Sequence, residues 1–549
     1  MAQAVGLGRL PAPLSEENKA WMTNQLESYS TWQMNAAGLG RALYILAAVV
    51  FSAVVCFEQY SKRKERLSKV PPGPFQWPYL GSLPYLIRTV GLRSSTRLRE
   101  KITELAMKHG PLMFLQIADT QIVVVSSGKI AKEVLVAHDA EFYFRPRCLV
   151  GKYLGFDSTN MAFAEGRNHW RLRQLCDKHL FLPECFASYG HVQKQEAEKM
   201  LHSVWEATKR GENISVRHTV ITFARNSLCR MLLGTAHLDI ENTSLEFNKE
   251  TLITLLDEAF AVAGETTLID LTPGLNWLDF HGREQKMKYL RRRLEKYFQE
   301  ILDDRSQRLD RSEPEAFVDV LLSLDEDKTL SDEAMMGVLL DTLVAGTYSI
   351  SASVEWALTE LVRNPTMLEN VQNEITQVVG PHHIVEVTEF SQLSYFQAIV
   401  KETLRLHPAM PMSIPHMNKV ATPLSSYEIP PNTSVVVDYA AIGRDSEIWP
   451  NPLDFDPRRF TDTDAASQID SFKFLPFGYG RRVCPGANLG LRLLQLGLAH
   501  LVQGFDWIPI EGQLPHDIDI KESSGAICFK STPLILRAIP RLASTLYEI

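Results

Sequence analysis

Ten residues near the carboxyl end of the chain, 477–486, combine residue types that together suit the binding of a metal-containing group. They read Phe-Gly-Tyr-Gly-Arg-Arg-Val-Cys-Pro-Gly. Gly478 and Gly480 can adopt the positive φ that a tight turn needs. No Cys-x-x-Cys pair or Cys/His cluster accompanies Cys484, so a zinc site is not expected. The neighbouring sequence offers no base for a nucleophilic thiol either.

The residues around Cys484 predict the environment of its sulfur. Pro485 suits the first turn of a helix, and the apolar run 489–501 is long enough to be that helix. A sulfur at a helix N-terminus lies in the positive end of the helix dipole, which lowers the pKa of the thiol. Arg481 and Arg482 add positive charge nearby. We therefore expect a thiolate, and a single thiolate can be the axial ligand of haem iron; a small buried core cysteine is the alternative.

The pattern Phe-x-x-Gly-x-Arg-x-Cys-x-Gly resembles the haem-binding signature of the cytochrome P450 family. The resemblance implies that Cys484 ligates the iron of haem b and that Arg482 contacts a haem propionate. It also implies that Phe477, Gly478 and Gly486 belong to the loop that holds the haem. Electrons would then come from NADPH through NADPH–cytochrome P450 reductase.

The same resemblance assigns further side chains to the haem. Where the family has a tryptophan and, four residues on, an arginine that hold a propionate, this chain has Trp170 and then glutamine at position 174. Trp170 keeps an indole N–H, and either Arg171 or Arg173 supplies the cation; a solvated basic helix face is the alternative. Downstream, His416 ends an extended apolar segment that by resemblance passes beside the haem, and we expect it to reach a propionate.

Residues 330–363 predict one long helix, with a serine hydroxyl as N-cap and acids in the first turn. In its middle, the small residues Ala345 and Gly346 would leave room for oxygen or substrate. The family usually follows this pair with an acid and a threonine that relay protons, and here Tyr348 and Ser349 take their places. Ser349 keeps a hydroxyl, but a phenol with a pKa of about 10 is a poor relay at neutral pH. Protons would then arrive through water or another group, or the chemistry is unusual.

Other motifs resemble supporting parts of the same family. Glu402 and Arg405 stand three residues apart on one predicted helix face, and with Arg459 they match a buried charge triad of structural role. Segments 410–415 and 523–529 are expected to line the substrate pocket.

Three further segments are predicted from their local pattern. Residues 112–125 predict a β-hairpin. The irregular stretch 146–166 is long enough to be a functional loop over a pocket. The apolar but turn-rich segment 268–282 resembles the lid-like connection of plant microsomal members.

The amino-terminal part predicts a membrane anchor. Residues 36–57 are an apolar run interrupted only by Arg41, which can snorkel to the interface. A basic cluster follows at 62–69, which by the positive-inside rule lies in the cytosol. A buried core helix is the alternative. The expected organisation is a polar tail 1–35, a transmembrane anchor 36–57, a basic linker and proline-rich hinge 58–74, and a haem-thiolate catalytic domain 75–549.

Composition sets outer bounds on these assignments. The 549 residues are 45% hydrophobic, enough for one large domain or two modest ones. The formal net charge of −8 argues against nucleic acid as a partner. Seven irregularly spaced cysteines do not suggest a disulfide framework, so a reducing compartment fits.

The motifs occur across residues 36–549 in the order that the family has them. Their residues are similar to those of plant microsomal cytochromes P450 of secondary metabolism. The resemblance implies a mainly α triangular-prism fold with a small β-rich lobe, preceded by one transmembrane helix in the endoplasmic reticulum. The implied function is a monooxygenase that inserts one oxygen atom from O2 into a small, largely apolar organic substrate. A haem-thiolate isomerase or dehydratase that needs neither O2 nor reductase stays open because of Tyr348. A non-catalytic haem-binding protein is a second alternative.

Overall fold

The computed structural model describes residues 69–77, 79–90, 95–234, 249–264, 282–308, 316–324, 330–461 and 472–548, with a few residues between 16 and 27. The contacts of the chain divide it into two units, residues 1–69 and 70–549. The anchor 36–57, most of the tail 1–35 and of the linker 58–74, and the lid segment 268–281 lie outside the described residues. The elements named below belong to the second unit.

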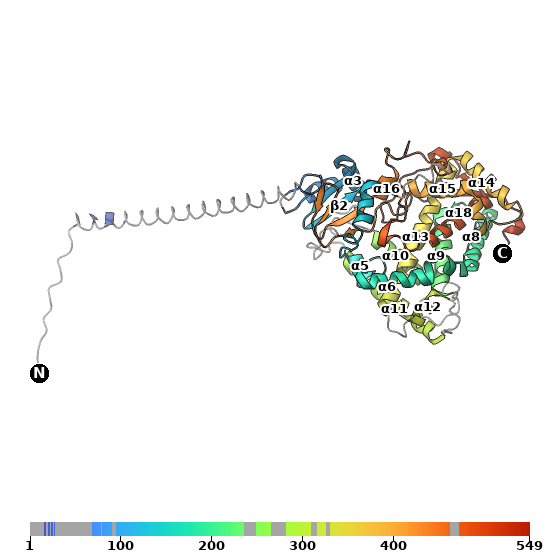
Figure 1. The fold of residues 1–549 in the computed structure, drawn as a ribbon, viewed down its shortest axis with the longest axis horizontal. Coiled ribbons are helices and arrows are strands. Elements are labelled where there is room, and N and C mark those ends of the chain that lie inside the picture. Colours follow the sequence, from blue (N-terminus) through green and yellow to red (C-terminus); the bar gives the residue numbers. More distant parts are fainter. Residues whose placement is uncertain are drawn as a thin grey trace. The chain divides into compact units, whose positions relative to one another are not determined.

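Helices make up most of this unit (Figure 1). The helices are α2 (Leu83–Val90), α3 (Ser95–His109), α4 (Gly128–Lys132), α5 (Leu149–Tyr153), α6 (Gly166–Cys176), α7 (Pro183–Ser188), α8 (Gly190–Lys209), α9 (Val216–Leu233), α10 (Lys249–Gly264), α11 (Arg283–Arg308), α12 (Phe317–Leu324), α13 (Asp332–Arg363), α14 (Pro365–Val379), α15 (Ser394–Leu406), α16 (Tyr439–Gly443) and α18 (Ala487–Gly504). The strands are β1 (Leu112–Ile117), β2 (Thr120–Val125), β3 (Ile214–Ser215), β4 (His416–Met417), β5 (Thr422–Leu424), β6 (Tyr427–Ile429), β7 (Ser434–Val437), β8 (Phe505–Pro509) and β9 (Ile535–Pro540).

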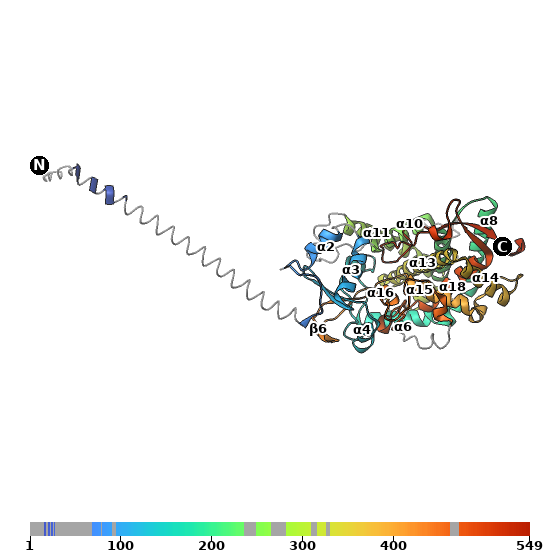
Figure 2. The same ribbon diagram turned by 90° about the horizontal axis from the view of Figure 1, so that it is seen from above.

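The largest described sheet has the strand order β1-β2-β7-β4. β1 and β2 pair antiparallel, so the hairpin predicted at 112–125 is confirmed. β7 joins β2 in parallel and brings β4 into the sheet from the other side. Figure 1 shows β2 and α3 at one end of the unit, with α8 and α14 at the opposite end, and Figure 2 shows the same for the three helices. The four-stranded sheet therefore lies away from α8 and α14, whereas the small sheet β3-β9-β8 packs against α8 and α9.

Helix α13 is the central element of the fold. It runs from Asp332 to Arg363, and the Ser331 hydroxyl accepts a hydrogen bond from the Ala334 N–H at 3.3 Å, so the predicted helix and its cap are confirmed. Helices α9 and α18 pack against it. By length and composition it is the one described helix that could cross a membrane, but 67% of its most apolar window is buried. It is therefore the core helix of the unit.

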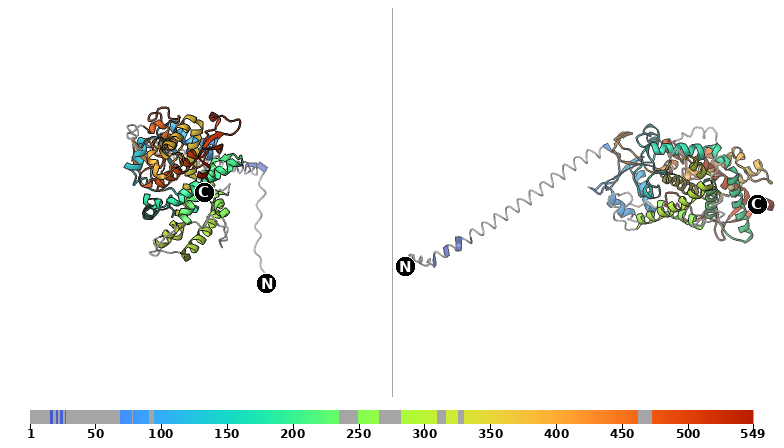
Figure 3. Two further views of the ribbon diagram at one scale, coloured as in Figure 1. Left: turned by 90° about the vertical axis from the view of Figure 1, so that its right-hand side faces the viewer. Right: turned by 90° about the horizontal axis from the view of Figure 1, so that it is seen from below.

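The carboxyl terminus closes the unit against α8. The Tyr547 ring stacks on Trp205 with the ring centroids 5.5 Å apart. The Tyr547 hydroxyl also accepts a hydrogen bond from the Arg541 N–H at 3.1 Å. In the right-hand view of Figure 3, the carboxyl terminus lies at the end of the unit opposite its blue amino-terminal helices. Tyr547 is thus part of the packed core, whereas residues 543–545 and 548 around it are exposed.

The predicted charge triad is confirmed. Arg405 and Glu402 are both fully buried and bond side by side, with Arg405 Nε 2.6 Å from Glu402 Oε2. Arg459 approaches the other carboxylate oxygen at 3.3 Å. Arg405 also donates to the Gly443 and Pro452 carbonyls, at 2.6 and 2.8 Å. The triad therefore joins α15 to the segments before the Cys484 loop.

Replacing Glu402 by alanine should lower the free energy of unfolding by about 3–5 kcal/mol, because Arg405 would keep a buried charge without its partner. The matched control is Arg458→Ala, which removes an ion pair from a side chain that is 82% exposed. It should change stability by less than about 1 kcal/mol. Urea unfolding of both variants measures the difference, and similar losses would contradict the structural role of the triad.

Candidate active site

The loop 477–486 forms the tight turn that its glycines predict. The Cys484 N–H donates to the Phe477 carbonyl at 2.9 Å. Gly478 and Gly480 have φ angles of +71° and +76°. A Cβ on Gly480 would lie 2.5 Å from the carbonyl oxygen of Leu135, so only glycine lets the loop pack against its neighbour here.

The Cys484 residue is exposed to solvent, but many protein atoms surround its sulfur and exclude most of the water from it. Helix α18 begins at Ala487 rather than at Pro485, so the sulfur lies before the first helical turn. Burial raises the pKa of the Cys484 thiol, and the Gly486 N–H and Arg173 oppose this effect only in part. The predicted lowering of the thiol pKa is therefore wrong, because desolvation outweighs the nearby dipole and charge. A bound metal cation would have to displace the thiol proton.

Two arginines place charge at this loop: the buried Arg145 beside it and the half-buried Arg482 within it. The Arg145 guanidinium, in a residue 7% exposed, donates to three backbone carbonyls at 2.9 to 3.1 Å. Arg482 also donates to backbone carbonyls, at 2.6 to 3.5 Å. Neither guanidinium forms an ion pair within the part of the chain that the structure describes. Burial, with Arg482 next in effect, lowers the pKa of Arg145 to about 9, so these two cations destabilise each other.

Two buried histidines complete a group that we call the cation cluster: Arg145, His169, His416 and Arg482. Burial and the arginines lower the pKa of each histidine to about 3, so both rings are neutral at pH 7. The Nδ1 atom of His169 is buried and has no hydrogen-bond partner among the residues that the structure describes. His416 Nδ1 lies 3.1 Å from the Phe142 carbonyl, which can only accept, so the proton is on Nδ1 and Nε2 has none to donate. Donation from His416 to a propionate stays a prediction that requires a charged ring.

The cation cluster would be stabilised by an anion. The Arg145 and Arg482 guanidinium groups repel each other where water is largely excluded. The buried Nδ1 atom of His169 also has no hydrogen-bond partner among the described residues. The two propionates of haem b would supply negative charge of the right kind and number. With the accessible thiol of Cys484 as an axial ligand, the residues present fit haem.

Helix α6 carries the predicted haem contacts Trp170 and Arg171 on its exposed face. Trp170 is 44% exposed, and Arg171 is exposed as well. His169 and Arg173 share the opposite, inward face, because residues four apart lie above one another on a helix. Arg173 donates to the Val483 carbonyl at 2.6 Å, next to Cys484. The assignment of Trp170 and Arg171 to a haem propionate stays a prediction, and the structure adds His169 and Arg173 as a second pair with the same spacing.

The middle of α13 presents one small side chain. Ala345 is exposed although it lies in the core helix, and Ser349, one turn further on the same face, is half-buried. Gly346 faces α9 instead, where a Cβ would lie 2.7 Å from the Leu228 side chain. The predicted room is therefore left by Ala345, whereas Gly346 permits the close packing of two helices. In this respect the sequence prediction for Gly346 is wrong.

The Tyr348 hydroxyl is engaged with other helices. It donates to the Asp257 carboxylate of α10 and lies 3.3 Å from the Arg225 guanidinium of α9, which donates to it. Burial and then Asp257 raise the pKa of Tyr348 above its ordinary value. The phenol proton is therefore held at Asp257.

An acid that the sequence motifs do not single out lies on the Ala345 face of α13. Asp341 precedes Ala345 by four residues and Ser349 by eight. Its carboxylate accepts from the Asn160 side-chain amide at 2.7 Å and from the Ala162 N–H at 3.1 Å. Burial raises the pKa of Asp341 to about 6, and these hydrogen bonds act in the opposite direction. This carboxyl can therefore gain or lose a proton near neutral pH.

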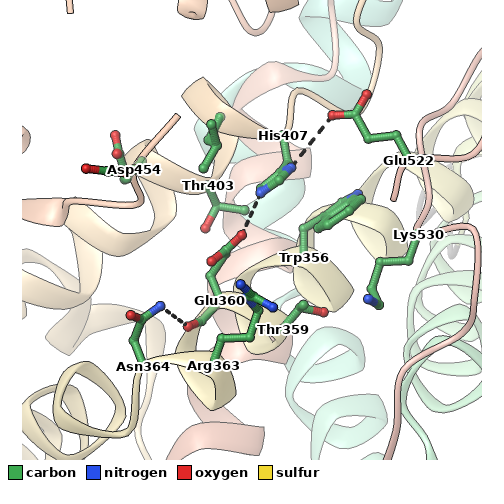
Figure 4. A network of polar contacts seen from close by, with 12 residues as sticks. Trp356, Thr359, Glu360, Arg363, Asn364, Thr403, His407, Asp454, Glu522 and Lys530 are labelled. Atoms are coloured by element: carbon green, nitrogen blue, oxygen red, sulfur yellow. Dashed lines mark hydrogen bonds and ion pairs between the residues drawn. The ribbon is translucent and has the colours of Figure 1, made fainter. Parts of the chain in front are cut away.

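A polar network fixes the segment 522–530, which contains the predicted pocket-lining stretch. Glu522 forms an ion pair with Arg99 at 3.1 Å. His407 lies between two carboxylates, 2.9 Å from Glu360 and 3.8 Å from Glu522 (Figure 4). This network attaches the carboxyl-terminal segment to α3, α13 and the end of α15.

Some of these residues have a sequence signal and others do not. The pair His169 and Arg173 has the i, i+4 spacing that the family motif uses, so the pattern could have identified it. Arg145 has no such signal, because two of its carbonyl partners belong to Ile414 and Pro415, far along the chain. Asp341 has no sequence signal either, because only the structure shows that it shares a face of α13 with the accessible Ala345.

Three comparisons with known proteins bear on this site. A family model described as cytochrome P450 matches residues 71–537. A flavonoid 3'-monooxygenase of Petunia hybrida is 33% identical over 92% of this chain and 98% of its own length. A trimethyltridecatetraene synthase of Zea mays is also 33% identical, over 92% of this chain and 94% of its own length. A solved zebra fish cytochrome P450 with progesterone has a TM-score of 0.70 at 23% identity, covering 80% of this chain and 99% of that one, which confirms the predicted fold.

Acidification should stabilise the protein through Asp341. Since its folded pKa of about 6 lies above its ordinary 3.8, the folded state holds the proton more tightly. This contribution is complete below the ordinary pKa and is lost as the pH rises through 6. Relative to Asp341→Asn, the wild type should therefore gain about 1–3 kcal/mol between pH 7.5 and pH 4.

Thermal unfolding midpoints measured over this pH range test the prediction. The control is Glu369→Gln, at an exposed carboxylate of α14, which should follow the wild type at each pH. If the unfolding midpoints of wild type and Asp341→Asn differ by the same amount at every pH, Asp341 does not have the raised pKa.

Proposed function

The chain belongs to the cytochrome P450 family and is a haem-thiolate monooxygenase, and from this premise we propose how its own residues carry the reaction. Monooxygenases of this family bind haem, take electrons from NADPH through a redox partner and hydroxylate small organic substrates. The observation that carries the assignment of residues is the accessible Cys484 thiol beside the cation cluster.

In this proposal, Cys484 would ligate the haem iron, and the loop 477–486 holds its sulfur in place. Arg145, Arg482 and the free Nδ1 of His169 hold the propionates, which relieves the mutual repulsion of the cluster. When bound, thiolate-ligated haem supplies the reductive cleavage of dioxygen, with one oxygen atom passing to the substrate and the other to water.

The side chains on one face of α13 hold the protons that the reaction consumes. Ala345 leaves room beside the helix, and Ser349 presents a hydroxyl on the same face. Asp341 exchanges protons near neutral pH, but about 12 Å of helix separates it from Ser349, so water must connect the two. Tyr348 takes no part, because its proton is held by Asp257.

The substrate is a small, largely apolar organic molecule of secondary metabolism. Met410, Ile527 and Phe529, from the two segments predicted to line the pocket, pack together beside α13. Relatives of equal identity are named for a flavonoid and for trimethyltridecatetraene, so similarity alone does not narrow the substrate further. Because these relatives are named as monooxygenases, hydroxylases or synthases, nothing favours an isomerase, a dehydratase or a non-catalytic haem protein.

We also propose the membrane arrangement that the sequence predicts. Residues 36–57 would anchor the chain in the endoplasmic reticulum by a single span, with the catalytic domain 75–549 in the cytosol. The support is the apolar run followed by a basic cluster. The electron donor in that compartment would be NADPH–cytochrome P450 reductase.

The ligand assignment predicts a spectroscopic signature. The reduced, carbon-monoxide-treated protein should absorb to the red of a histidine-ligated haem protein, because thiolate donates more electron density. Cys484→Ser should lose this band. Cys185→Ser, at a half-buried free cysteine outside the loop 477–486, should keep it. Retention of the band in Cys484→Ser would exclude Cys484 as the ligand.

The reaction class predicts the co-substrates. With reductase and a substrate found by a spectral binding screen, product formation should require both NADPH and O2. Isotopically labelled O2 should place one labelled atom in each hydroxylated product. Product formed without NADPH and O2 would instead establish an isomerase or dehydratase.

A further inference from the structure

Tyr348 is the point where three helices meet. Its side chain projects from α13, its hydroxyl donates to Asp257 of α10, and Arg225 of α9 lies within reach of both partners. The Arg225 guanidinium is 2.5 Å from the Asp257 carboxylate. We call these three side chains the α10 latch.

In the α10 latch, the Tyr348 hydroxyl both donates and accepts a hydrogen bond. A phenol has one proton, and here that proton is donated to a carboxylate, a strong acceptor. The oxygen in turn accepts from a guanidinium. A residue at this position therefore acts as a connector between helices rather than as a source of protons.

The ring of Tyr348 joins the same helix to the pocket-lining segments. It stacks on Phe260 of α10, with the ring centroids 3.8 Å apart and the planes within 14°. Phe260 meets Phe529 edge-on at 6.2 Å. Ile527 and Met410 belong to the same apolar cluster. Any displacement of α10 from Tyr348 would therefore change the wall that these side chains form.

We propose that Tyr348 is a positioning residue that, through Asp257, holds α10 against the pocket-lining segments and so controls the entry and fit of bulky substrates. The inference deepens the proposed function, on which it rests. The position where the family usually carries a proton-relaying acid sets substrate access in this chain.

The exposure of the latch is suited to reversible opening. The Asp257 side chain is 52% exposed, whereas that of Arg225 is 8% exposed. Water can therefore replace the bonds to the carboxylate on its outer side, while the arginine and the tyrosine stay in the core. The buried apolar residues of α10, among them Leu255 and Leu256, keep the helix attached near its place.

The test uses the full-length enzyme and two kinds of variant. Tyr348→Phe keeps the stacked ring and removes only the hydroxyl, and Asp257→Asn removes the charge at the other end. The matched control is Glu258→Gln, at the neighbouring carboxylate of α10, which forms no hydrogen bond or ion pair with the three described latch residues. Amide hydrogen exchange without ligand should be about fivefold faster in α10 for both latch variants and unchanged in α14. Fivefold is the factor expected for losing one hydrogen bond of ordinary net strength, because the Asp257 side chain is 52% exposed and water weakens the bond to its charge.

A second measurement reports on access rather than on stability. The association rates of imidazole and of a bulky azole, clotrimazole, are followed by the change in the haem spectrum. In Tyr348→Phe and Asp257→Asn, clotrimazole should bind about three- to fivefold faster, while imidazole, which needs no displacement of α10, should bind at the wild-type rate. Glu258→Gln should leave both rates unchanged.

Several outcomes would overturn the inference. Unchanged exchange in α10, or equal changes in the rates for the two azoles, would show that the latch does not control access. A marked gain in the coupling of NADPH use to product in Tyr348→Asp would show that position 348 is a proton relay. The complete absence of a spectral change with imidazole would instead contradict the haem assignment, and hydrogen exchange would still decide on the latch.

Discussion

The structure depends on the positive charges of the buried Arg145 and the half-buried Arg482, neither of which has a carboxylate partner among the described residues. Arg145 and Arg482 make hydrogen bonds to carbonyls, yet carbonyl dipoles neutralise no charge, and burial with mutual repulsion lowers the pKa of Arg145 to about 9. His169 adds a buried nitrogen with no partner. Such an arrangement is costly in a chain that works alone and favourable in one that encloses a dianionic cofactor. The accessible thiol of Cys484 then gives that cofactor its orientation, and cofactor binding becomes part of the stability of the fold.

Helix α13 organises the other side of the same space. Asp341 attaches the loop at 160–162, and Tyr348 attaches α10, two turns further along the helix. Ala345 lies between these two attachments and is the small, accessible residue of the segment. The helix thus holds both neighbours by polar contacts, with the accessible Ala345 between them.

Two further groups of ionised side chains support the fold around these residues, and neither takes part in the proposed reaction. The buried pair of Glu402 and Arg405 fixes the path of the chain toward the Cys484 loop through backbone carbonyls. The network of His407 and Glu522 holds the carboxyl-terminal segment against α13. In both, ionised side chains are satisfied by several partners at once, which is the condition under which buried charge stabilises one arrangement over others.

The sequence by itself determined the elements that follow from local pattern or from a contiguous motif: the thiol-bearing loop, the hairpin, the capped helix α13 and the charge triad. Local spacing and turn chemistry decide these features. Only the tertiary structure decided which way side chains face and how far they are desolvated. It showed that His169 rather than Trp170 points inward, that burial raises the pKa of Cys484, and that the Tyr348 hydroxyl belongs to Asp257. Desolvation and contact between distant segments depend on the whole packed chain, and no local pattern records them.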